Sequence, residues 1–213
     1  MLKLYLVRHG ESAWNQRRVY TGQQDVPLSE LGQRQAAQLA EHLAETPLAE
    51  IYASPLKRAN DTVQPLAKLK HQNITLDARL AEIHHGAWEG NSASEVRTQY
   101  AAEYLAWRTQ PHRVQMPEGE SLEDVAQRVQ SFLRDVLAAY ADGNILIATH
   151  DAVLRVIVLQ TMLMGLEYFW RWRFDNAALT IVERMPDGHF RLALLNDGHH
   201  LEGVQSNCEH HAL

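Results

Sequence analysis

Three short apolar segments, each followed by polar residues and then by a helical pattern, constrain the fold of this chain most strongly. They are KLYLV (3–7), EIYAS (50–54) and NILIATH (144–150). A continuous apolar run such as the first is typical of a strand that is buried on both faces of a parallel sheet. The alternation of strands and helices predicts an α/β fold, a three-layer α/β/α sandwich with a mainly parallel central sheet.

The segments that follow these strands have the spacing of amphipathic helices. In LSELGQRQAAQLAEHLAE (28–45), apolar residues recur on one helical face, and Ser29 can cap the first turn. Ser54 and Pro55 predict the cap and the first turn of a helix over residues 55–69. Further helices are expected over residues 122–140 and 151–163.

A turn signal near the C-terminus predicts a hairpin. The segments LTIVERM (179–185) and HFRLALL (189–195) flank the sequence Pro186-Asp187-Gly188. We expect these strands at the antiparallel end of the sheet, so that the sheet has an antiparallel edge strand.

Polar side chains with specific chemistry stand where the three central strands end. Arg8 and His9 follow the first strand, residues 54–58 follow the second, and Thr149 and His150 end the third. In open α/β sheets, ligands bind beyond the carboxyl ends of the strands. These residues are therefore expected to converge on one site at that edge of the sheet.

Two arginines and two histidines at one site indicate phosphoryl chemistry. Arg8 and Arg58 offer planar charged groups that suit phosphate oxygens and could neutralise a dianion. A neutral imidazole such as His9 can attack phosphorus, and a second one such as His150 can stabilise the equatorial oxygens of the transition state. A protonated histidine together with the two arginines would supply the positive charge that a metal ion otherwise provides.

Charge and composition restrict the partner. The chain has 213 residues, 46% of them hydrophobic and 22% charged, which is long for one domain but too short to expect two. Its formal net charge is −6 and it has no basic block, so neither nucleic acid nor an anionic membrane is expected as a partner. The most apolar window, residues 145–166, is not expected to span a membrane, because it contains His150, Asp151 and Arg155, which are costly in hydrocarbon. A small molecule is the expected partner.

Cysteine usage and the N-terminus indicate a cytoplasmic protein. The chain has one cysteine, Cys208, which cannot form an internal disulfide. The apolar residues before Arg8 are too few for a signal peptide.

Two other patterns invite competing interpretations. The pairs His84-His85, His199-His200 and His210-His211 suggest metal binding, but adjacent side chains seldom point at one ion and no further ligand spacing supports a site. The run FWRWRF (169–174) suggests stacking on nucleic acid, but the negative charge favours a half-buried strand or a packing surface. An apolar surface on this run could support a homodimer.

Six segments carry a family resemblance, and they occur in the family's order from residue 6 to residue 155. They are LVRHGESAWN (6–15), YTGQQDVPLSELGQRQA (20–36), SPLKRANDT (54–62), LAEIHHGAWEG (80–90), PEGESLEDVAQRV (117–129) and ATHDAVLR (148–155). With these motifs the chain resembles the histidine phosphatase superfamily, which contains the phosphoglycerate mutases and many phosphomonoesterases. RHG alone is a weak signal, whereas RHG, SPLxRAxxT and TH in this order are specific.

The resemblance implies roles for individual residues. His9 matches the phosphorylated nucleophile, and Arg8, Arg58 and His150 match the rest of the phosphate pocket. Glu82 matches the general acid, whose pKa must be raised so that it holds a proton near neutral pH. Positions that contact phosphate or the rest of the substrate are matched by Asn15 and by the stretch Thr21-Gly22-Gln23, and His84 and His85 are further candidate contacts. No metal ion and no cofactor are expected.

The resemblance leaves two reactions open: hydrolysis of the phosphoester, as in the phosphatases, and transfer of the phosphoryl group to another hydroxyl, as in the mutases. Mutases of the family tend to have an arginine after the acid and a longer insert over the site, where this chain has Ile83 and only residues 91–116, enough for a small helical cap. The ending Trp88-Glu89-Gly90 resembles the phosphatases, whereas Tyr20-Thr21-Gly22 is closer to the mutases. We therefore expect a metal-independent phosphatase within a single domain, acting on a small phosphomonoester. A cofactor-dependent phosphoglycerate mutase and a non-catalytic phospholigand-binding protein are the alternatives.

Overall fold

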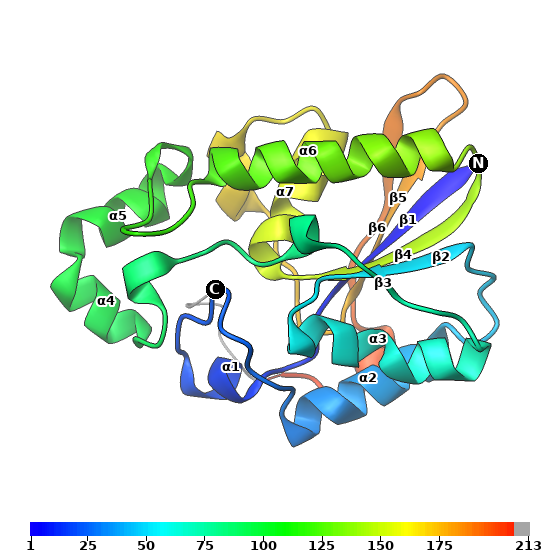
Figure 1. The fold of residues 1–213 in the computed structure, drawn as a ribbon, viewed down its shortest axis with the longest axis horizontal. Helices are drawn as coiled ribbons and strands as arrows, with labels where there is room; N and C mark the ends of the chain where they lie inside the picture. Colours follow the sequence, from blue (N-terminus) through cyan, green and yellow to red (C-terminus); the bar gives the residue numbers. More distant parts are fainter. Residues whose placement is uncertain (207–213) are drawn as a thin grey trace.

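The computed structural model of the chain describes residues 1–206, and its centre is one six-stranded sheet. The strand order is β3-β2-β4-β1-β5-β6. The strands are β1 (Leu2–Arg8), β2 (Glu50–Ala53), β3 (Thr75–Leu76), β4 (Gly143–Thr149), β5 (Leu179–Arg184) and β6 (Phe190–Asp197). Helices cover both faces of this sheet (Figure 1). The predicted α/β fold with a mainly parallel sheet is therefore confirmed.

The pairing of the strands brings the ends of β1 and β4 together. These two strands pair in parallel, in a register that sets Leu2 opposite Gly143 and Arg8 opposite Thr149. β2 pairs in parallel with β4 and with the short strand β3, which the sequence did not predict. β5 runs antiparallel to β1, and β6 pairs antiparallel with β5 and forms the edge, as the predicted hairpin requires. The residues that follow β1 and β4 consequently emerge side by side.

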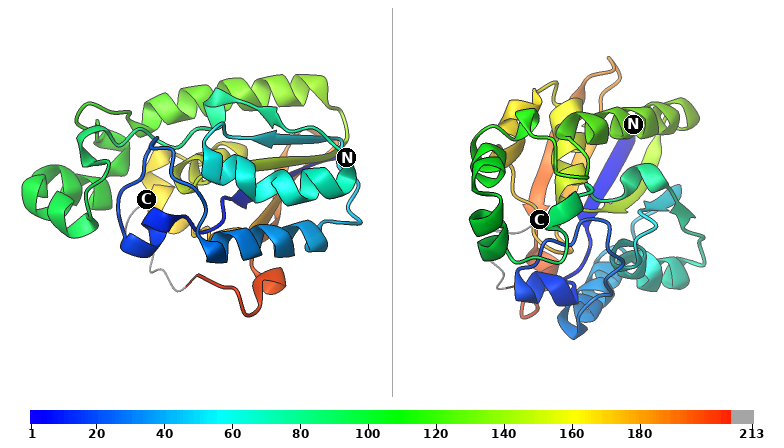
Figure 2. Two further views of the ribbon diagram at one scale, coloured as in Figure 1. Left: turned by 60° about the horizontal axis from the view of Figure 1, so that its bottom comes forward. Right: turned by 60° about the vertical axis from the view of Figure 1, so that its left-hand side comes forward.

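Four helices form the outer layers and bury the two faces of the sheet. α2 (Glu30–His42) and α3 (Lys57–Lys70) cover one face, and α6 (Leu122–Ala139) and α7 (Asp151–Thr161) cover the other (Figure 2). β4 supplies both cores, because successive side chains of a strand point to opposite faces. Its Ile145 and Ile147 join the core on the α6 and α7 side, and Leu146 and Ala148 join the core on the α2 and α3 side.

The remaining helical segments are short. α4 (Ala93–Gln99), α5 (Ala101–Thr109) and the 3₁₀ turn η3 (Pro111–Arg113) make the segment 91–116 helical, as expected. Figure 1 shows α4 and α5 at the end of the molecule toward which β1 runs. That this segment caps the site, and that the whole chain is one domain, remain predictions. The other short segments are α1 (Ala13–Arg17), η1 (Ala78–Leu80), η2 (Gly86–Trp88), η4 (Leu166–Arg171) and η5 (His199–Leu201).

The structure confirms one predicted helix cap and corrects another. The Ser29 side chain accepts a hydrogen bond from the Gly32 amide at 3.0 Å and caps α2. Ser54 does not cap α3, which begins at Lys57 after Leu56 and has no side-chain cap. The Ser54 hydroxyl instead lies 2.8 Å from a ring nitrogen of His150. A serine that follows a strand and precedes a proline has the sequence pattern of a cap, but here its hydroxyl is used by the site.

The run FWRWRF does not form the half-buried strand that its alternation favoured. Its first part lies in the 3₁₀ turn η4, and the rest is irregular. Phe169 and Phe174 are buried, and the Trp170 indole donates a hydrogen bond to the Trp107 carbonyl at 2.7 Å. The alternative prediction of a packing surface fits this arrangement. The aromatic residues of this run are buried or partly buried, so the run does not form the exposed apolar surface that suggested a homodimer. The homodimer itself stays a prediction.

Some expectations fall outside the part of the chain that the structure describes. Cys208 and the pair His210-His211 belong to residues 207–213, which are not described, and the cytoplasmic location stays a prediction. Within residues 1–206, no helix has both the length and the apolar character needed to cross a membrane.

Candidate active site

The ring of His9 follows β1 and is held from two sides. Its Nδ1 lies 2.7 Å from the Gly10 carbonyl oxygen, and its Nε2 lies 3.3 Å from Nε of Arg58. A carbonyl only accepts and a guanidinium only donates, so Nδ1 carries the proton and Nε2 presents its lone pair. Burial, followed by the charges of Arg58 and Arg8, holds the pKa of His9 well below its ordinary value. The ring is therefore neutral and oriented, as a nitrogen nucleophile must be.

The backbone around His9 is fixed by residues from other elements. The Asn176 amide donates to the His9 carbonyl at 2.9 Å, and the Gly10 amide donates to the Thr62 hydroxyl at 2.8 Å. A Cβ atom on Gly10 would lie 2.8 Å from the carbonyl oxygen of Gly32, at the start of α2. Only glycine lets the loop after β1 approach α2 this closely.

Arg58 lies at the start of α3 and points its guanidinium at His9. Nη1 donates to the Gln24 carbonyl at 2.8 Å and Nη2 donates to the Gly22 carbonyl at 2.7 Å. With both Nη atoms bonded to carbonyls, the Nε atom of the guanidinium faces His9. Burial lowers the pKa of Arg58 to about 10, so the group stays charged at neutral pH. No carboxylate lies within ion-pair distance of Arg58 in residues 1–206, so its charge can serve an anion.

Arg8 is the second cation of the pocket and is oriented from the opposite side. Its Nη1 donates to the Phe174 carbonyl at 2.7 Å and lies 3.7 Å from Oδ1 of Asp151. The same carboxylate pairs with Arg155 at 3.0 Å. One buried carboxylate thus faces two arginines, Arg8 and Arg155.

His150, the fourth residue of the predicted phosphate pocket, lies at the start of α7. Its ring lies 5.1 Å from the His9 ring between centroids, and its Nε2 lies 2.8 Å from the Ser54 hydroxyl. Burial, then the charge of Arg58, holds its pKa well below the ordinary value, so the expected protonated histidine is not present without an anion. Its buried Nδ1 has no hydrogen-bond partner within the described residues, which fits a site that receives an oxygen of a ligand.

Glu82 lies in the irregular segment between η1 and η2 and is buried. Its carboxylate accepts a hydrogen bond from the Ile83 amide at 2.9 Å. Burial, with a smaller contribution from Asp151, raises its pKa to about 7, against the opposite effects of the Ile83 amide, Arg58 and Arg8. The raised pKa expected of a general acid is therefore confirmed. Ile83 and Trp88, which lie near Glu82 in the sequence, are fully buried.

Two of the predicted substrate contacts have local structural partners. The Asn15 side chain accepts hydrogen bonds from the amide and the hydroxyl of Ser12, at 2.9 and 3.0 Å, and completes the capping box of α1. The Thr21 hydroxyl donates to the Val19 carbonyl at 3.3 Å. Their contact with substrate stays a prediction.

The stretch Thr21-Gly22-Gln23 contacts both Arg58 and Glu82. Gly22 supplies a carbonyl to Arg58, and the Gln23 amide group donates to the Glu82 carbonyl at 3.0 Å. The Glu89 carboxylate holds this stretch in place, since it accepts from the Gln23 backbone amide at 3.0 Å and from the Gln24 side chain at 2.9 Å. Sequence reasoning used Glu89 only as part of the WEG ending and missed this role.

His85 lies in a cluster of aromatic rings. Its ring is fully buried, 5.0 Å from the Tyr20 ring, 6.3 Å from Trp88 and 6.1 Å from Trp107 between centroids. Burial lowers the pKa of His85 to about 3, and neither ring nitrogen has a hydrogen-bond partner in the described part of the chain. This packing argues for a structural role, and the predicted substrate contact remains to be tested.

Two of the three histidine pairs fall within the described residues, and a histidine of each has its own local contact. The half-exposed His84 ring lies 3.7 Å from the Glu89 carboxylate, while His200 stacks on His42 with ring centroids 4.7 Å apart. Across residues 1–206, no group of three or more histidine, cysteine, aspartate or glutamate side chains is arranged to hold a metal ion.

Comparison with known proteins gives the family. The sequence model of the histidine phosphatase superfamily (branch 1) matches residues 4–198. Phosphoserine phosphatase 1 of Hydrogenobacter thermophilus is 36% identical over 182 residues, which are 85% of this chain and 86% of that protein. A protein of Proteus mirabilis named as a probable phosphoglycerate mutase is 32% identical over 191 residues, 86% of this chain and 85% of that one.

Solved structures match the fold closely. Bacillus stearothermophilus YhfR has a TM-score of 0.89 at 32% identity, over 94% of this chain and 100% of that one. A mycobacterial glucosyl-3-phosphoglycerate phosphatase in complex with inorganic phosphate has a TM-score of 0.83 at 26% identity, over 93% of this chain and 98% of that one.

This chain belongs to the histidine phosphatase superfamily. It is thus an enzyme of a phosphatase family, as the motifs indicated. The structure brings Arg8, His9, Arg58 and His150 into one buried cluster, with Glu82 within electrostatic reach of both arginines.

Proposed function

We propose that this enzyme hydrolyses a small phosphomonoester through a phosphohistidine on His9, without a metal ion. The observation that carries the proposal is the state of His9, which is buried, neutral and has its Nε2 lone pair directed at the guanidinium of Arg58. A phosphate group that binds the guanidinium brings phosphorus next to that lone pair. The substrate class includes phosphoserine-, phosphoglycerate- and α-ribazole-phosphate-like monoesters, in keeping with the names of several relatives.

In the first step, Nε2 of His9 attacks phosphorus and the bond to the ester oxygen breaks. Arg8 and Arg58 stabilise the charge on the equatorial oxygens, and Nδ1 of His150 is available to one of them. A phosphate dianion raises the pKa of a neighbouring imidazole, so His150 gains its proton when substrate binds. Glu82, with its pKa raised to about 7, gives its proton to the departing oxygen.

In the second step, water replaces the alcohol and the phosphorus–nitrogen bond breaks. Glu82 is now a carboxylate, so it accepts a proton from the attacking water. Inorganic phosphate leaves, and the neutral His9 and the protonated Glu82 are restored. Both halves of the reaction use the same carboxyl group in opposite directions.

A specific observation favours hydrolysis over phosphoryl return to a second hydroxyl. A mutase must grip the substrate carboxylate while its intermediate reorients, and an arginine beside the acid would supply a bidentate grip. The side chain in that position here is Ile83, which is fully buried. The segment 91–116 is also short for a lid that excludes water from a phosphoenzyme, although relatives with mutase names keep that alternative relevant.

This assignment is tested by measuring whether the phosphoenzyme transfers its phosphoryl group to water or to a second hydroxyl. The enzyme is given 3-phosphoglycerate with a trace of 2,3-bisphosphoglycerate, and both free phosphate and 2-phosphoglycerate are followed. A panel of other monoesters is tested in parallel for release of phosphate. We expect phosphate from a preferred monoester with negligible isomerisation. Isomerisation much faster than any hydrolysis would assign the enzyme to the mutases, and no turnover of any aryl or alkyl phosphate would assign it to the non-catalytic binding proteins.

The role of Glu82 has a test of its own. Departure of p-nitrophenol scarcely needs a proton, whereas departure of an alkyl alcohol does. Glu82→Gln should therefore slow alkyl phosphates by about 10²- to 10⁴-fold and p-nitrophenyl phosphate far less. Equal losses on the two substrates would reject the acid role.

A further inference from the structure

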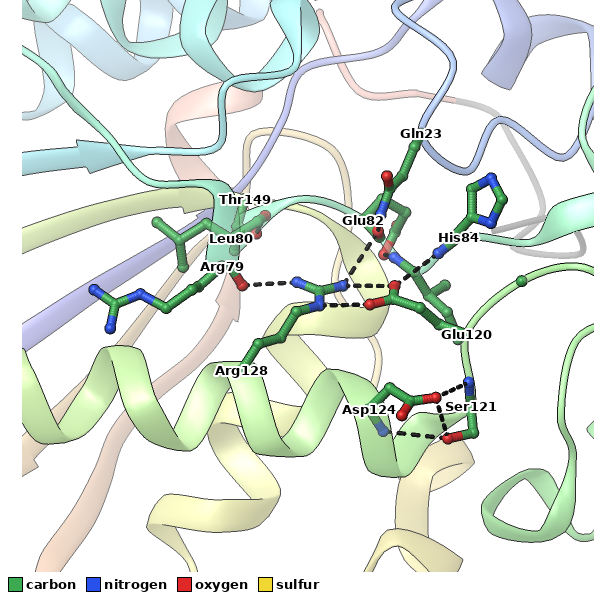
Figure 3. Close-up of polar contacts among 12 residues, drawn as sticks. Gln23, Arg79, Leu80, Glu82, His84, Glu120, Ser121, Asp124, Arg128 and Thr149 are labelled. Atoms are coloured by element: carbon green, nitrogen blue, oxygen red, sulfur yellow. Dashed lines mark hydrogen bonds and ion pairs between the residues drawn. The ribbon is translucent and has the colours of Figure 1, made fainter.

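The segment that carries the general acid has no regular secondary structure to hold it. Residues 81–85 connect η1 with η2, and the position of Glu82 depends on contacts with other elements. Figure 3 shows that one side chain of α6, Arg128, makes several of these contacts. This arginine belongs to neither the phosphate pocket nor the roles that the resemblance assigned.

Arg128 uses both ends of its guanidinium on the acid segment. Nη1 donates to the Arg79 carbonyl at 2.7 Å, and Nη2 donates to the Glu82 carbonyl at 3.2 Å. The first contact lies in η1 and the second is on the acid itself, so one planar group spans the start of the segment. The side chain is largely buried, with 16% of it exposed.

Glu120 completes the arrangement. Its two carboxylate oxygens accept from Nε and Nη2 of Arg128 at 3.0 and 3.1 Å. The carboxylate also accepts from the His84 backbone amide at 2.9 Å, and the Glu120 amide donates to the His84 carbonyl at 2.8 Å. Both flanks of Glu82 are thus tied to a single charged pair, which we name the Arg128–Glu120 clamp.

The start of α6, next to Glu120, is itself held by hydrogen bonds. Ser121 and Asp124 form a capping box at the start of α6, with hydrogen bonds of 2.7 to 3.2 Å (Figure 3). On the far side, the Thr149 hydroxyl donates to the Leu80 carbonyl at 2.6 Å. Hydrogen bonds therefore hold the acid segment and its N-terminal flank from two sides, from the end of β4 and from the start of α6.

We infer that Arg128, paired with Glu120, is a positioning residue that holds the Glu82 carboxyl toward the leaving oxygen of the substrate. This inference rests on the proposed function of Glu82 as the acid. Its physical basis is that charge-assisted, bidentate contacts restrict a loop more strongly than neutral ones. Proton transfer needs hydrogen-bond distance between the acid and the leaving oxygen, so a displaced loop impairs that step more than the others.

Arg128→Lys is the informative variant. Lysine keeps the positive charge but carries its donors on one nitrogen, so it loses the planar fork whose three nitrogens bind two carbonyls and both oxygens of the carboxylate. The charge matters because Arg128 also contributes to the low pKa of His150, and lysine leaves that influence in place. The matched control is Arg134→Lys on the same helix, where the side chain is 74% exposed and pairs with Asp135 on the surface.

The readout is the ratio of kcat/KM for an alkyl phosphate to that for p-nitrophenyl phosphate. For Arg128→Lys we expect a loss of about 10- to 100-fold on the alkyl ester and less than about threefold on the aryl ester. Arg134→Lys should leave both within about twofold of the parent enzyme. Glu120→Gln, which keeps Arg128 but weakens its bidentate partner, should give a smaller loss with the same selectivity.

The double variant separates this inference from the proposal on which it rests. In a Glu82→Gln background the acid can donate no proton, so Arg128→Lys should cause no further selective loss. Equal losses on the two esters by Arg128→Lys, or full additivity with Glu82→Gln, would overturn the positioning role alone. Glu82→Gln without selectivity would instead overturn the acid role. If thermal unfolding shows that Arg128→Lys does not fold, Glu120→Gln decides the question by the same criterion.

Discussion

Two buried histidines of this molecule have the same electrostatic tendency and very different surroundings. His9 and His85 are both nearly or fully inaccessible, and burial is the first cause of the low pKa of each. His9 has a hydrogen-bond partner on each nitrogen, one of which is the guanidinium of Arg58. His85 has no hydrogen-bond partner on either nitrogen within residues 1–206 and contacts aromatic rings.

The comparison separates what burial does from what hydrogen bonds do. Burial is the largest cause of the low pKa of both imidazoles, and neighbouring charges lower each pKa further. The partners decide which nitrogen carries the proton and where the lone pair points, and only the ring of His9 is oriented in this way. Burial also acts on Glu82, where it raises the pKa of the carboxyl to about 7. In our proposal, the Arg128–Glu120 clamp supplies the orientation that burial cannot.

The largest expected effect is the loss of the oriented imidazole. His9→Ala removes the nucleophile and should lower kcat by at least about 10⁴-fold on every monoester. His85→Phe fills the same volume with an aromatic ring and removes two buried polar atoms without partners, so kcat should stay within about threefold and the melting temperature should rise. Steady-state kinetics and thermal unfolding of the two variants measure both effects.

The opposite outcomes have clear meanings. A His9→Ala enzyme with near-normal turnover would rule out the covalent mechanism. A His85→Phe enzyme with a large rise in KM would restore His85 as a substrate contact and remove the contrast between the two rings.

A smaller loss should follow when the partner of His9 changes. Arg58→Lys keeps a positive charge but loses the fork that binds two carbonyls and faces Nε2 of His9. We expect kcat/KM to fall by about 10²- to 10³-fold. The exposed Arg173 offers the control, and Arg173→Lys should change nothing. An Arg58→Lys enzyme that matches this control would show that charge alone suffices.

The buried acid should be visible in the pH dependence of stability. The pKa of Glu82 is raised from 4.5 to about 7, so between these pH values the native state holds a proton that the unfolded chain has released. Its stabilising contribution is full below pH 4.5 and is lost as the pH rises through 7. The free energy of unfolding of Glu82→Gln relative to the parent should therefore rise by about 3 kcal/mol from pH 4.5 to 8. Urea unfolding of both proteins at several pH values measures this difference, and a constant difference would place the pKa near its ordinary value.

The smallest expected effect is that of a chelator. Two arginines, with His150 once it is protonated by a bound phosphate, supply the positive charge at the phosphate pocket. Dialysis against EDTA should leave kcat/KM within about 20% of its starting value. A loss of activity that one divalent ion restores would revive the metal interpretation of the histidine pairs.

Local patterns predicted much of this fold and its central pocket. Buried parallel strands are short apolar runs, and the polar residues at their ends are the ones that meet, which located His9 and His150. Ser54 shows the limit of such reasoning, because its position after a strand predicted a cap while its hydroxyl is used by His150. FWRWRF shows another, since the packing of Phe169 and Trp170 on Trp107 overrides its alternating pattern.

The supporting contacts of the site could not be predicted in this way. Glu89 and Gln23, like Arg128 and Glu82, are far apart in the chain, and each is an ordinary polar residue in its own segment. Their pairing depends on the register of whole elements, which no local pattern records. Both Glu89 and Arg128 lie inside segments that carried the resemblance, and that was the only signal that could have drawn attention to them.

The covalent intermediate on His9 is the central claim, and rapid quenching tests it most directly. The enzyme is mixed with a ³²P-labelled monoester, quenched in base within milliseconds and digested, and the labelled peptide is sequenced. We expect phosphate that is stable in base and labile in acid, on the peptide containing His9, formed and lost at rates that match turnover. Active enzyme that carries no such phosphate at any time, or that carries it on another residue, would contradict the mechanism.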